Sequence, residues 1–195
     1  MKNTIIDIRG YKPLDTESYL LDANIWLSIC YPMGDYEKQR AAIYSAFLKA
    51  AINNQSKIVI CSMILAEVIN RWFHIEFDIL RGKEPHTYSE YKRDFRGREI
   101  YKKVAKEIET GVSIQILRVA LPIDDDFSQA NLKATLSDIK ETDFNDLCHA
   151  ELASREKLVF VTNDGDFASI GDNIKVLTAN SKMLSIARSS NDGKN

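Results

Sequence analysis

The chain has 195 residues, enough for one domain with a sizeable core, and its content of 45% hydrophobic and 28% charged residues is ordinary for a globular protein. A net charge of −2 excludes a global attraction to nucleic acid, so any nucleic-acid site must be a local patch. Three cysteines without a CxxC or Cys/His metal spacing favour buried thiols in a reducing compartment. With no signal-peptide core and no stretch of ~20 apolar residues, we expect a cytoplasmic protein without a membrane partner.

The first part of the chain predicts an extension, two strands and two helices. Residues 1–17 contain turn residues and are interpreted as an N-terminal extension. A short apolar run, about Ser18–Leu21, predicts the first strand, and the short helix after it is broken at Pro32. Residues 36–53 predict a helix, and the β-branched run Lys57–Cys61 predicts the second strand. Three apolar residues of the extension are expected to pack on the domain: Ile5, Ile6 and Ile8.

A long helix and an irregular insertion come next. Ser62 suits an N-cap, and the spacing of apolar residues after it predicts a helix over Met63–Leu80. Residues 78–122 are punctuated by glycine and proline and are interpreted as a helical insertion. Within it, Arg98–Leu117 predicts a helix, and Arg118–Ile123 either finishes that helix or forms a short strand.

The last third of the chain alternates again between helices and strands. A helix is predicted at about 125–139, and Thr142 is expected to cap another over Asp143–Glu156. Leu158–Thr162 predicts a buried strand, and Ile174–Leu177 a final short one.

This alternation predicts an α/β fold with a mostly parallel sheet. The predicted domain covers residues 18–180, with the helical insertion at about 78–122. Residues 181–195 are interpreted as a C-terminal tail, frayed from Ser189 onward.

Four carboxylates fall at one edge of the predicted sheet. Asp22 ends the first strand, Glu67 lies early in the helix after the second, and Asp164 follows the 158–162 strand. Asp146 is near the start of the helix that feeds that strand, and this helix begins at the same edge. Like charges so close disfavour ionisation, and a divalent cation relieves the conflict. Oxygen ligands favour Mg²⁺, so we expect a magnesium site here.

Other catalytic patterns are absent from the sequence. It contains no HExxH, P-loop, GxGxxG or GxSxG pattern. The three histidines, His74, His86 and His149, share no ligand spacing. His149 is interpreted as a helix-surface or packed residue rather than a base.

Residues 81–106 form a basic segment, with nine Lys/Arg against four Asp/Glu. Aromatic residues are interleaved with the charges, which suits a surface for single-stranded nucleic acid. The alternative is a solvated helical face whose aromatic rings turn to the core. The basic residues that we expect to contact RNA are Lys92, Arg93 and Arg96; the aromatic residues are Tyr88, Tyr91, Phe95 and Tyr101.

The acidic segments, in this order, resemble the motifs of the PIN domain family, and among its members the VapC-type toxins of toxin–antitoxin pairs. The resemblance covers about residues 18–180. The segments that carry it are Leu21-Asp22-Ala23-Asn24, Ser62-Met63-Ile64-Leu65-Ala66-Glu67, Asn145-Asp146-Leu147-Cys148-His149-Ala150 and Val161-Thr162-Asn163-Asp164-Gly165-Asp166-Phe167.

The resemblance implies a three-layer α/β/α sandwich and an endoribonuclease that uses Mg²⁺ or Mn²⁺, in which water attacks phosphorus and leaves 3′-hydroxyl and 5′-phosphate ends. It also implies an RNA substrate, an antitoxin protein as partner if the chain is a toxin, and the homodimer common in the family. Carried over residue by residue, the metal-binding positions are Asp22, Glu67, Asp146 and Asp164. The supporting polar positions are Asn24 and Thr162; Asp143 and Asp166 are further carboxylates nearby, and the choice between Asp164 and Asp166 stays open.

Three alternatives remain at this point. The extension and the insertion make the chain longer than a compact toxin, which leaves a PIN nuclease of another RNA pathway open. A second reading is a non-catalytic PIN-like module that binds RNA or protein through the basic segment. A third is another Mg²⁺-dependent phosphoryl-transfer α/β enzyme, such as a phosphatase of the haloacid dehalogenase type. That family has a second Asp two residues after the first, where this chain has Asn24.

Overall fold

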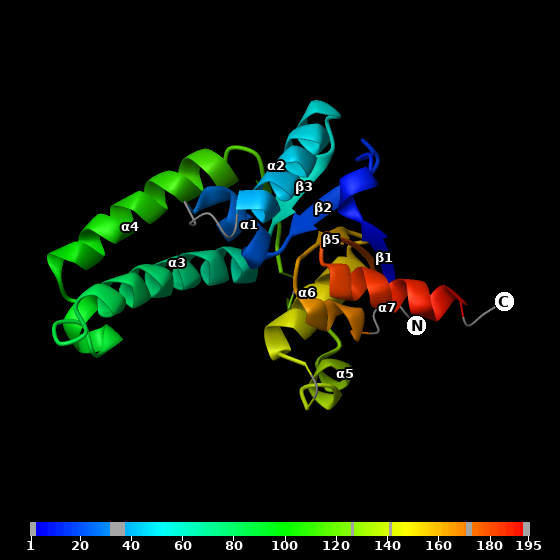
Figure 1. Ribbon diagram of the computed structural model, residues 1–195. Helices are drawn as coiled ribbons and strands as arrows, with labels where there is room; N and C mark the ends of the chain where they lie inside the picture. The colour runs from blue at the N-terminus through cyan, green and yellow to red at the C-terminus, as the bar shows by residue number, and fades with distance from the viewer. Residues whose placement is uncertain (1–2, 32–37, 126, 141, 171–172, 193–195) are drawn as a thin grey trace.

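The fold is built on a parallel β-sheet (Figure 1). The computed structural model describes residues 3–31, 38–125, 127–140, 142–170 and 173–192. Within these ranges the strands lie in the order β1-β6-β5-β2-β3-β4, and every pairing is parallel. The strands are β1 (Thr4–Asp7), β2 (Ser18–Leu21), β3 (Lys57–Ile60), β4 (Leu121–Pro122), β5 (Val159–Val161) and β6 (Lys175–Thr178).

Helices cover both faces of the sheet, which confirms the predicted three-layer α/β/α fold. The crossovers from β2 to β3 and from β4 to β5 place α1 and α2 on one face and α5 and α6 on the other, and α7 lies against β1 (Figure 1). The order of strands reverses between β2 and β5, so a crevice is expected beyond the carboxyl ends of these two strands. The helices are α1 (Ala23–Cys30), α2 (Lys38–Asn53), α3 (Ser62–Lys83), α4 (Glu99–Gly111), α5 (Leu132–Ser137), α6 (Phe144–Arg155) and α7 (Ser181–Asp192).

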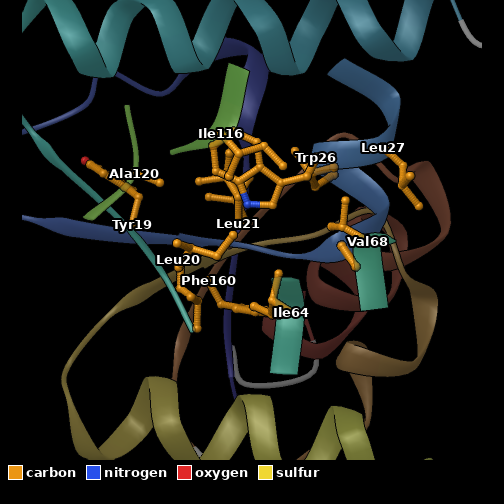
Figure 2. Packing of buried hydrophobic residues seen from close by; sticks show 14 of the residues in the cluster. Tyr19, Leu20, Leu21, Trp26, Leu27, Ile64, Val68, Ile116, Ala120 and Phe160 are labelled. Atoms are coloured by element: carbon orange, nitrogen blue, oxygen red, sulfur yellow. The ribbon is translucent and has the colours of Figure 1, made fainter. Parts of the chain in front are cut away.

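Strand β2 is the centre of the core. Its residues Tyr19, Leu20 and Leu21 are fully buried, because neighbouring strands pair on both sides and helices cover both faces. Figure 2 shows Tyr19 and Leu21 on the side of Trp26, and Leu20 on the side of Phe160. This alternation fixes the strand in register, so the residue that follows Leu21 has a defined position at the sheet edge.

Helices α3 and α4 project from the sheet as a pair (Figure 1). We call residues 72–116 the helical arm. The arm has its own aromatic cluster, in which Phe73 stacks on Tyr101 with ring centroids 4.4 Å apart, and the fully buried Phe95 lies beside both rings. The aromatic side chains of the basic segment therefore turn inward, as the second of the two interpretations predicts.

Gly111 sets the closest approach of the two arm helices. A Cβ at this position would lie 2.6 Å from the Cη2 atom of Trp72, closer than packed atoms come. The arm therefore requires glycine where α4 crosses α3.

The two terminal segments contribute more structure than the sequence indicates. Part of the predicted extension forms β1, an edge strand that pairs with β6, and Ile8 is buried as expected. The predicted tail contains α7, which lies against β1 and buries Met183 and Leu184. The frayed end expected from Ser189 is wrong up to Asp192, which is still helical; residues beyond lie outside the described ranges.

Three local predictions are wrong in detail. Cys61 rather than Ser62 is the N-cap of α3, and Ser62 instead hydrogen-bonds to the carboxylate of Asp125 through its hydroxyl and its N–H. The cap of α6 is Asp143, not Thr142, because a carboxylate accepts well from an exposed helix N–H. The helix expected over 125–139 is a 3₁₀ turn, Phe127–Gln129, followed by the short α5.

The other strands and helices begin and end within a few residues of the predicted limits. Residues 36 and 37 of the helix predicted over 36–53, and Pro32 and Gly34, lie outside the described ranges. Among the residues that the structure describes, no helix combines the length and the apolar composition that a membrane span requires.

Candidate metal centre

Asp22 lies at the carboxyl end of β2, where the strand passes into α1, and is 4% exposed. Its Oδ2 atom accepts a hydrogen bond of 2.6 Å from the hydroxyl of Thr162, which follows β5. The side-chain amide of Asn24 donates to the same oxygen, and its Oδ1 accepts from the N–H of Asn163. Asn24 and Thr162 thus fix the orientation of the carboxylate and tie β2 to β5.

Burial is the main reason that the pKa of Asp22 is raised to about 6. The hydrogen bond from Thr162 works in the opposite direction, but the negative charges of Glu67 and Asp164 raise the pKa further. The carboxylate form is therefore strained electrostatically in the absence of a cation.

Asp146 lies in the first turn of α6, which begins at the same edge of the sheet. Partial burial raises its pKa to about 7, and the charges of Asp22 and Asp164 contribute next, followed by those of Asp143 and Glu67. The charges that act on Asp146 come from the three carboxylates that the strand-end argument places with it and also from Asp143.

Glu67 lies in the second turn of α3, and its side chain is 24% exposed. Burial raises its pKa, the guanidinium of Arg71 lowers it, and the charges of Asp143 and Asp164 raise it again. The Arg71 Nε atom is 3.2 Å from its Oε1. Glu67 thus turns toward the other carboxylates, rather than being the solvated residue that its position on an amphipathic helix allows.

Asp164 and Asp166 differ in their surroundings. Asp164 is half-buried, its N–H donates to the Thr162 hydroxyl, and its charge raises the pKa values of Asp22, Glu67 and Asp146. Asp166 is exposed, and its N–H donates to Asp164 Oδ1 in a 3₁₀ turn. Of the two, Asp164 is the one whose charge acts on the cluster.

His149 is also at this site, which sequence reasoning missed. It is 1% exposed, so it is a packed residue and not a helix-surface one. One ring nitrogen of His149 and one carboxylate oxygen each of Asp22 and Glu67 lie within 4.8 Å of one another. Burial lowers the pKa of His149 to about 4, so the imidazole is neutral at pH 7. The only sequence signal was its position, three residues after Asp146 on the same helix face.

The donor set fits a divalent cation. Carboxylate oxygens crowd together with raised pKa values, and the buried His149 nitrogens have no hydrogen-bond partner among the described residues. A cation bound here would compensate the negative charges of the carboxylates and accept a lone pair from a nitrogen of His149.

The three residues predicted to contact RNA lie away from the carboxylates. Lys92, Arg93 and Arg96 are exposed on the segment that joins α3 to α4. This segment follows the end of α3, roughly 24 Å along the helix from Glu67 at 1.5 Å per residue. Arg93 is paired with Asp94 at 2.7 Å and with Glu90 at 3.0 Å, whose charges partly offset its own.

A pocket beside the carboxylates carries a second group of basic residues. Its volume is about 280 Å³, and its polar lining consists of Asn24, Arg40, Arg71, His74 and Asp78. These residues come from α1, α2 and α3, so the pocket was not visible as a run of basic residues in the sequence.

Comparisons with known proteins place the sequence in a family and identify structures with a similar fold. The family model described as "PIN domain" matches residues 19–173. A crystal structure of VapBC2 from Rickettsia felis, bound to a DNA fragment from its promoter, is similar over 83% of this chain and 98% of that one, with a TM-score of 0.52 and 17% identity. The structure of PAE2754 from Pyrobaculum aerophilum is similar over 93% of this chain and 96% of that one, with a TM-score of 0.46 and 15% identity. No curated protein matches the sequence significantly.

Proposed function

This chain belongs to the PIN domain family, and from that premise we propose that it is a metal-dependent endoribonuclease. The observation that carries the proposal is the crowding of carboxylates at the switch point of the sheet. Asp22 and Asp146 have pKa values of about 6 and 7 because each is buried near the charges of the others. A fold does not retain such a costly cluster on the grounds of stability, so the arrangement favours catalysis.

The residues that would hold the ion are Asp22, Glu67, Asp146 and Asp164, with Asp143 and Asp166 as nearby carboxylates. Mg²⁺ or Mn²⁺ bound there supplies activation of water and neutralisation of charge at the scissile phosphodiester.

The chain's own contribution is orientation and protection of these ligands. Thr162 and Asn24 direct the carboxylate of Asp22 by donating hydrogen bonds to its Oδ2 atom. Thr162 also accepts from the N–H of Asp164, so a single hydroxyl aligns two members of the cluster. Such supporting hydrogen bonds strengthen and orient ligands.

Two basic surfaces support RNA as the substrate. The pocket with Arg40 and Arg71 lies next to Asn24, where a phosphate adjoining the cleavage point would be held. Lys92, Arg93 and Arg96 on the arm would contact the strand farther along by charge alone, because the aromatic rings of this segment pack inward.

A role as the toxin of a type II pair is the proposed biological setting, with an antitoxin protein as partner, a homodimer as the assembly and the cytoplasm as the location. It is supported by the family and by the likeness in fold to VapBC2. Expression of the wild-type chain alone should arrest growth, and the Asp22→Asn variant should not. Normal growth with active nuclease would place the enzyme in another RNA pathway.

The second candidate function is a non-catalytic PIN-like module that binds RNA or protein. The exposed charges of the arm favour it, since they form a surface separate from the carboxylates. The crowded cluster opposes it, because unused buried carboxylates only lower the stability of the fold. Calorimetry in which wild-type protein binds no Mn²⁺ or Mg²⁺ would favour this candidate.

The chemistry is tested by the ends of the RNA products. Incubation of mixed structured RNAs with wild-type protein and Mn²⁺ should yield 5′-phosphate and 3′-hydroxyl ends, as expected when water attacks phosphorus. Cyclic phosphate ends would contradict the proposal, because they arise from attack by the RNA's own 2′-hydroxyl. A reaction with EDTA controls for metal-independent contaminants.

A further inference from the structure

His149 is a buried polar side chain without a hydrogen-bond partner. Its exposed fraction is 1%, and neither Nδ1 nor Nε2 bonds to any group among the described residues. Leaving a buried polar group unsatisfied costs about 1–3 kcal/mol, so such a group in a core calls for an explanation. A leucine at this position would avoid the cost, since His149 packs against Phe160.

The position of the imidazole supplies an explanation. One of its nitrogens lies within 4.8 Å of a carboxylate oxygen of both Asp22 and Glu67, a spacing close to that of ligands that share one ion. The side chain therefore points at the carboxylate cluster from the helix that also carries Asp146.

His149 also lines a small cavity whose other walls are mostly apolar. This cavity has a volume of about 10 Å³, and its lining includes His149, Asp125 and Thr135. A histidine that ligates a metal usually directs its other nitrogen to a carboxylate or to water. Asp125 is a carboxylate that lines this cavity together with His149, and its charge raises the pKa of the imidazole against the larger effect of burial; its two oxygens also accept hydrogen bonds from Ser62.

We propose that His149 is a direct nitrogen ligand of the metal and makes this a mixed nitrogen–oxygen site that selects a first-row transition-metal dication over Mg²⁺. The inference rests on the proposed function, since it concerns the ion of the same site. Mg²⁺ takes oxygen ligands almost exclusively, whereas imidazole suits transition metals, whose affinity for such sites also exceeds that of Mg²⁺. An all-carboxylate cluster would lack this discrimination.

The most direct test is pulsed electron paramagnetic resonance on wild-type protein loaded with Mn²⁺. A coordinated imidazole gives a ¹⁴N modulation of the Mn²⁺ signal, and we expect that modulation in the wild type and not in His149→Leu. Bound Mn²⁺ without ¹⁴N modulation in the wild type would overturn the inference while leaving the proposed function intact. This measurement decides the question even if the leucine variant does not fold.

Calorimetric titrations with Mn²⁺ and Mg²⁺ give the selectivity. Because changes of outer-shell partners already cost 10–100-fold, His149→Leu should weaken Mn²⁺ binding by about tenfold or more, with Mg²⁺ affinity changed by less than about threefold. Leu152→Val is the matched control, because Leu152 lines the same cavity without offering a ligand atom. Equal losses for both ions, or equal effects of the two variants, would overturn the inference. Wild-type protein that binds neither ion would contradict the proposed function itself.

Discussion

The carboxylate edge of the sheet and the helical arm differ in how their charged side chains are buried and paired. At the edge, Asp22, Glu67, Asp146 and Asp164 act on one another, and Arg71 is the cation that pairs with Glu67. On the arm, acidic and basic side chains such as Glu99 and Lys102 pair within one helical turn and stay exposed, and the buried Asp94, which pairs with Arg93, is the exception among the described pairs. Such surface pairs contribute little to stability.

The two regions also differ in what holds them together. The arm is held by packing, through its aromatic cluster and the close contact at Gly111, and by the hydrogen bonds that the buried Asp94 accepts from Ser89, Glu90 and Arg93. The edge is held in spite of its charges, because β2 and β5 are buried and their ends have no alternative position. Substitutions at the edge should therefore affect chemistry before stability, and packing substitutions in the arm should do the reverse.

The largest expected effect is that of Asp22→Asn on RNA cleavage. The substitution keeps the shape of the side chain and removes the charge that would bind the ion, so we expect a loss of about 1,000-fold or more in rate with the circular dichroism spectrum unchanged. Glu99→Gln on the arm is the matched loss of a carboxylate and should leave the rate unaltered. A rate for Asp22→Asn within tenfold of the wild-type rate would show that the sheet edge is not where the chemistry takes place.

The next largest effect concerns two glycines on the arm helices. Gly111→Ala forces a methyl group against Trp72, which should lower the free energy of unfolding by about 1–3 kcal/mol and the Tm by roughly 2–4 °C per kcal/mol. The activity of the molecules that remain folded should be preserved. Gly82→Ala on α3, where a methyl group meets nothing within 4 Å, should be neutral or slightly stabilising. Similar destabilisation by both variants would show that the tight contact is not the cause.

A smaller effect is expected from pH on metal-free protein. The pKa of Asp146 is raised to about 7, so its proton is bound more tightly in the folded state than in the unfolded one. The associated stability is present at low pH and is lost as pH rises through about 7. In EDTA, Asp146→Asn should therefore gain about 1 kcal/mol over wild type between pH 5 and pH 8, allowing for solvent at this half-buried group.

His149 also changes the stability of the protein with pH, in the opposite direction. Its contribution is the same in wild type and Asp146→Asn, so it cancels when their free energies of unfolding are subtracted. The pKa of His149 is lowered to about 4, so this residue favours the folded state increasingly as pH rises toward its ordinary value. Denaturant unfolding at each pH measures the difference. A difference that stays constant with pH would show that Asp146 is not strained by its neighbours.

The smallest effect is expected at the arm surface. The double variant Arg93→Glu, Arg96→Glu should weaken RNA binding and flatten its dependence on salt by about 0.7 in logarithmic slope for each RNA phosphate that the arm no longer neutralises. Lys49→Glu with Lys57→Glu, at exposed positions on α2 and the start of β3, is the control for net charge. An unchanged salt slope in the arm variant would remove the arm from the RNA surface and leave the pocket at Arg40 and Arg71.

The sequence predicts the parallel sheet and the gathering of the carboxylates because both follow from local patterns. A buried strand followed by Asp, as at Leu21 and Asp22, places the carboxylate at the sheet edge whatever the rest of the chain does. The inward turn of Phe95 could be stated only as one of two alternatives, since its pattern fits either a stacking surface or a second core.

The structural features that the sequence does not predict depend on contacts between elements that are distant in the chain. The edge strand β1 and helix α7 stabilise each other, and neither has a strong pattern alone. The inward position of His149 depends on how α6 packs on β5 and α3, which no local pattern encodes. The caps of α3 and α6 differ from the predicted residues by one position, within the usual uncertainty of helix limits.

We have proposed that the carboxylates at the sheet edge bind a divalent ion with which the protein cleaves RNA. The decisive measurement is the single-turnover cleavage rate of one structured RNA by wild type, Asp146→Asn and Asp166→Asn, each with Mn²⁺ and with EDTA. We expect cleavage by the wild type and by Asp166→Asn with Mn²⁺, and none by Asp146→Asn or in EDTA. Cleavage by Asp146→Asn at the wild-type rate, or cleavage that persists in EDTA, would contradict this proposal.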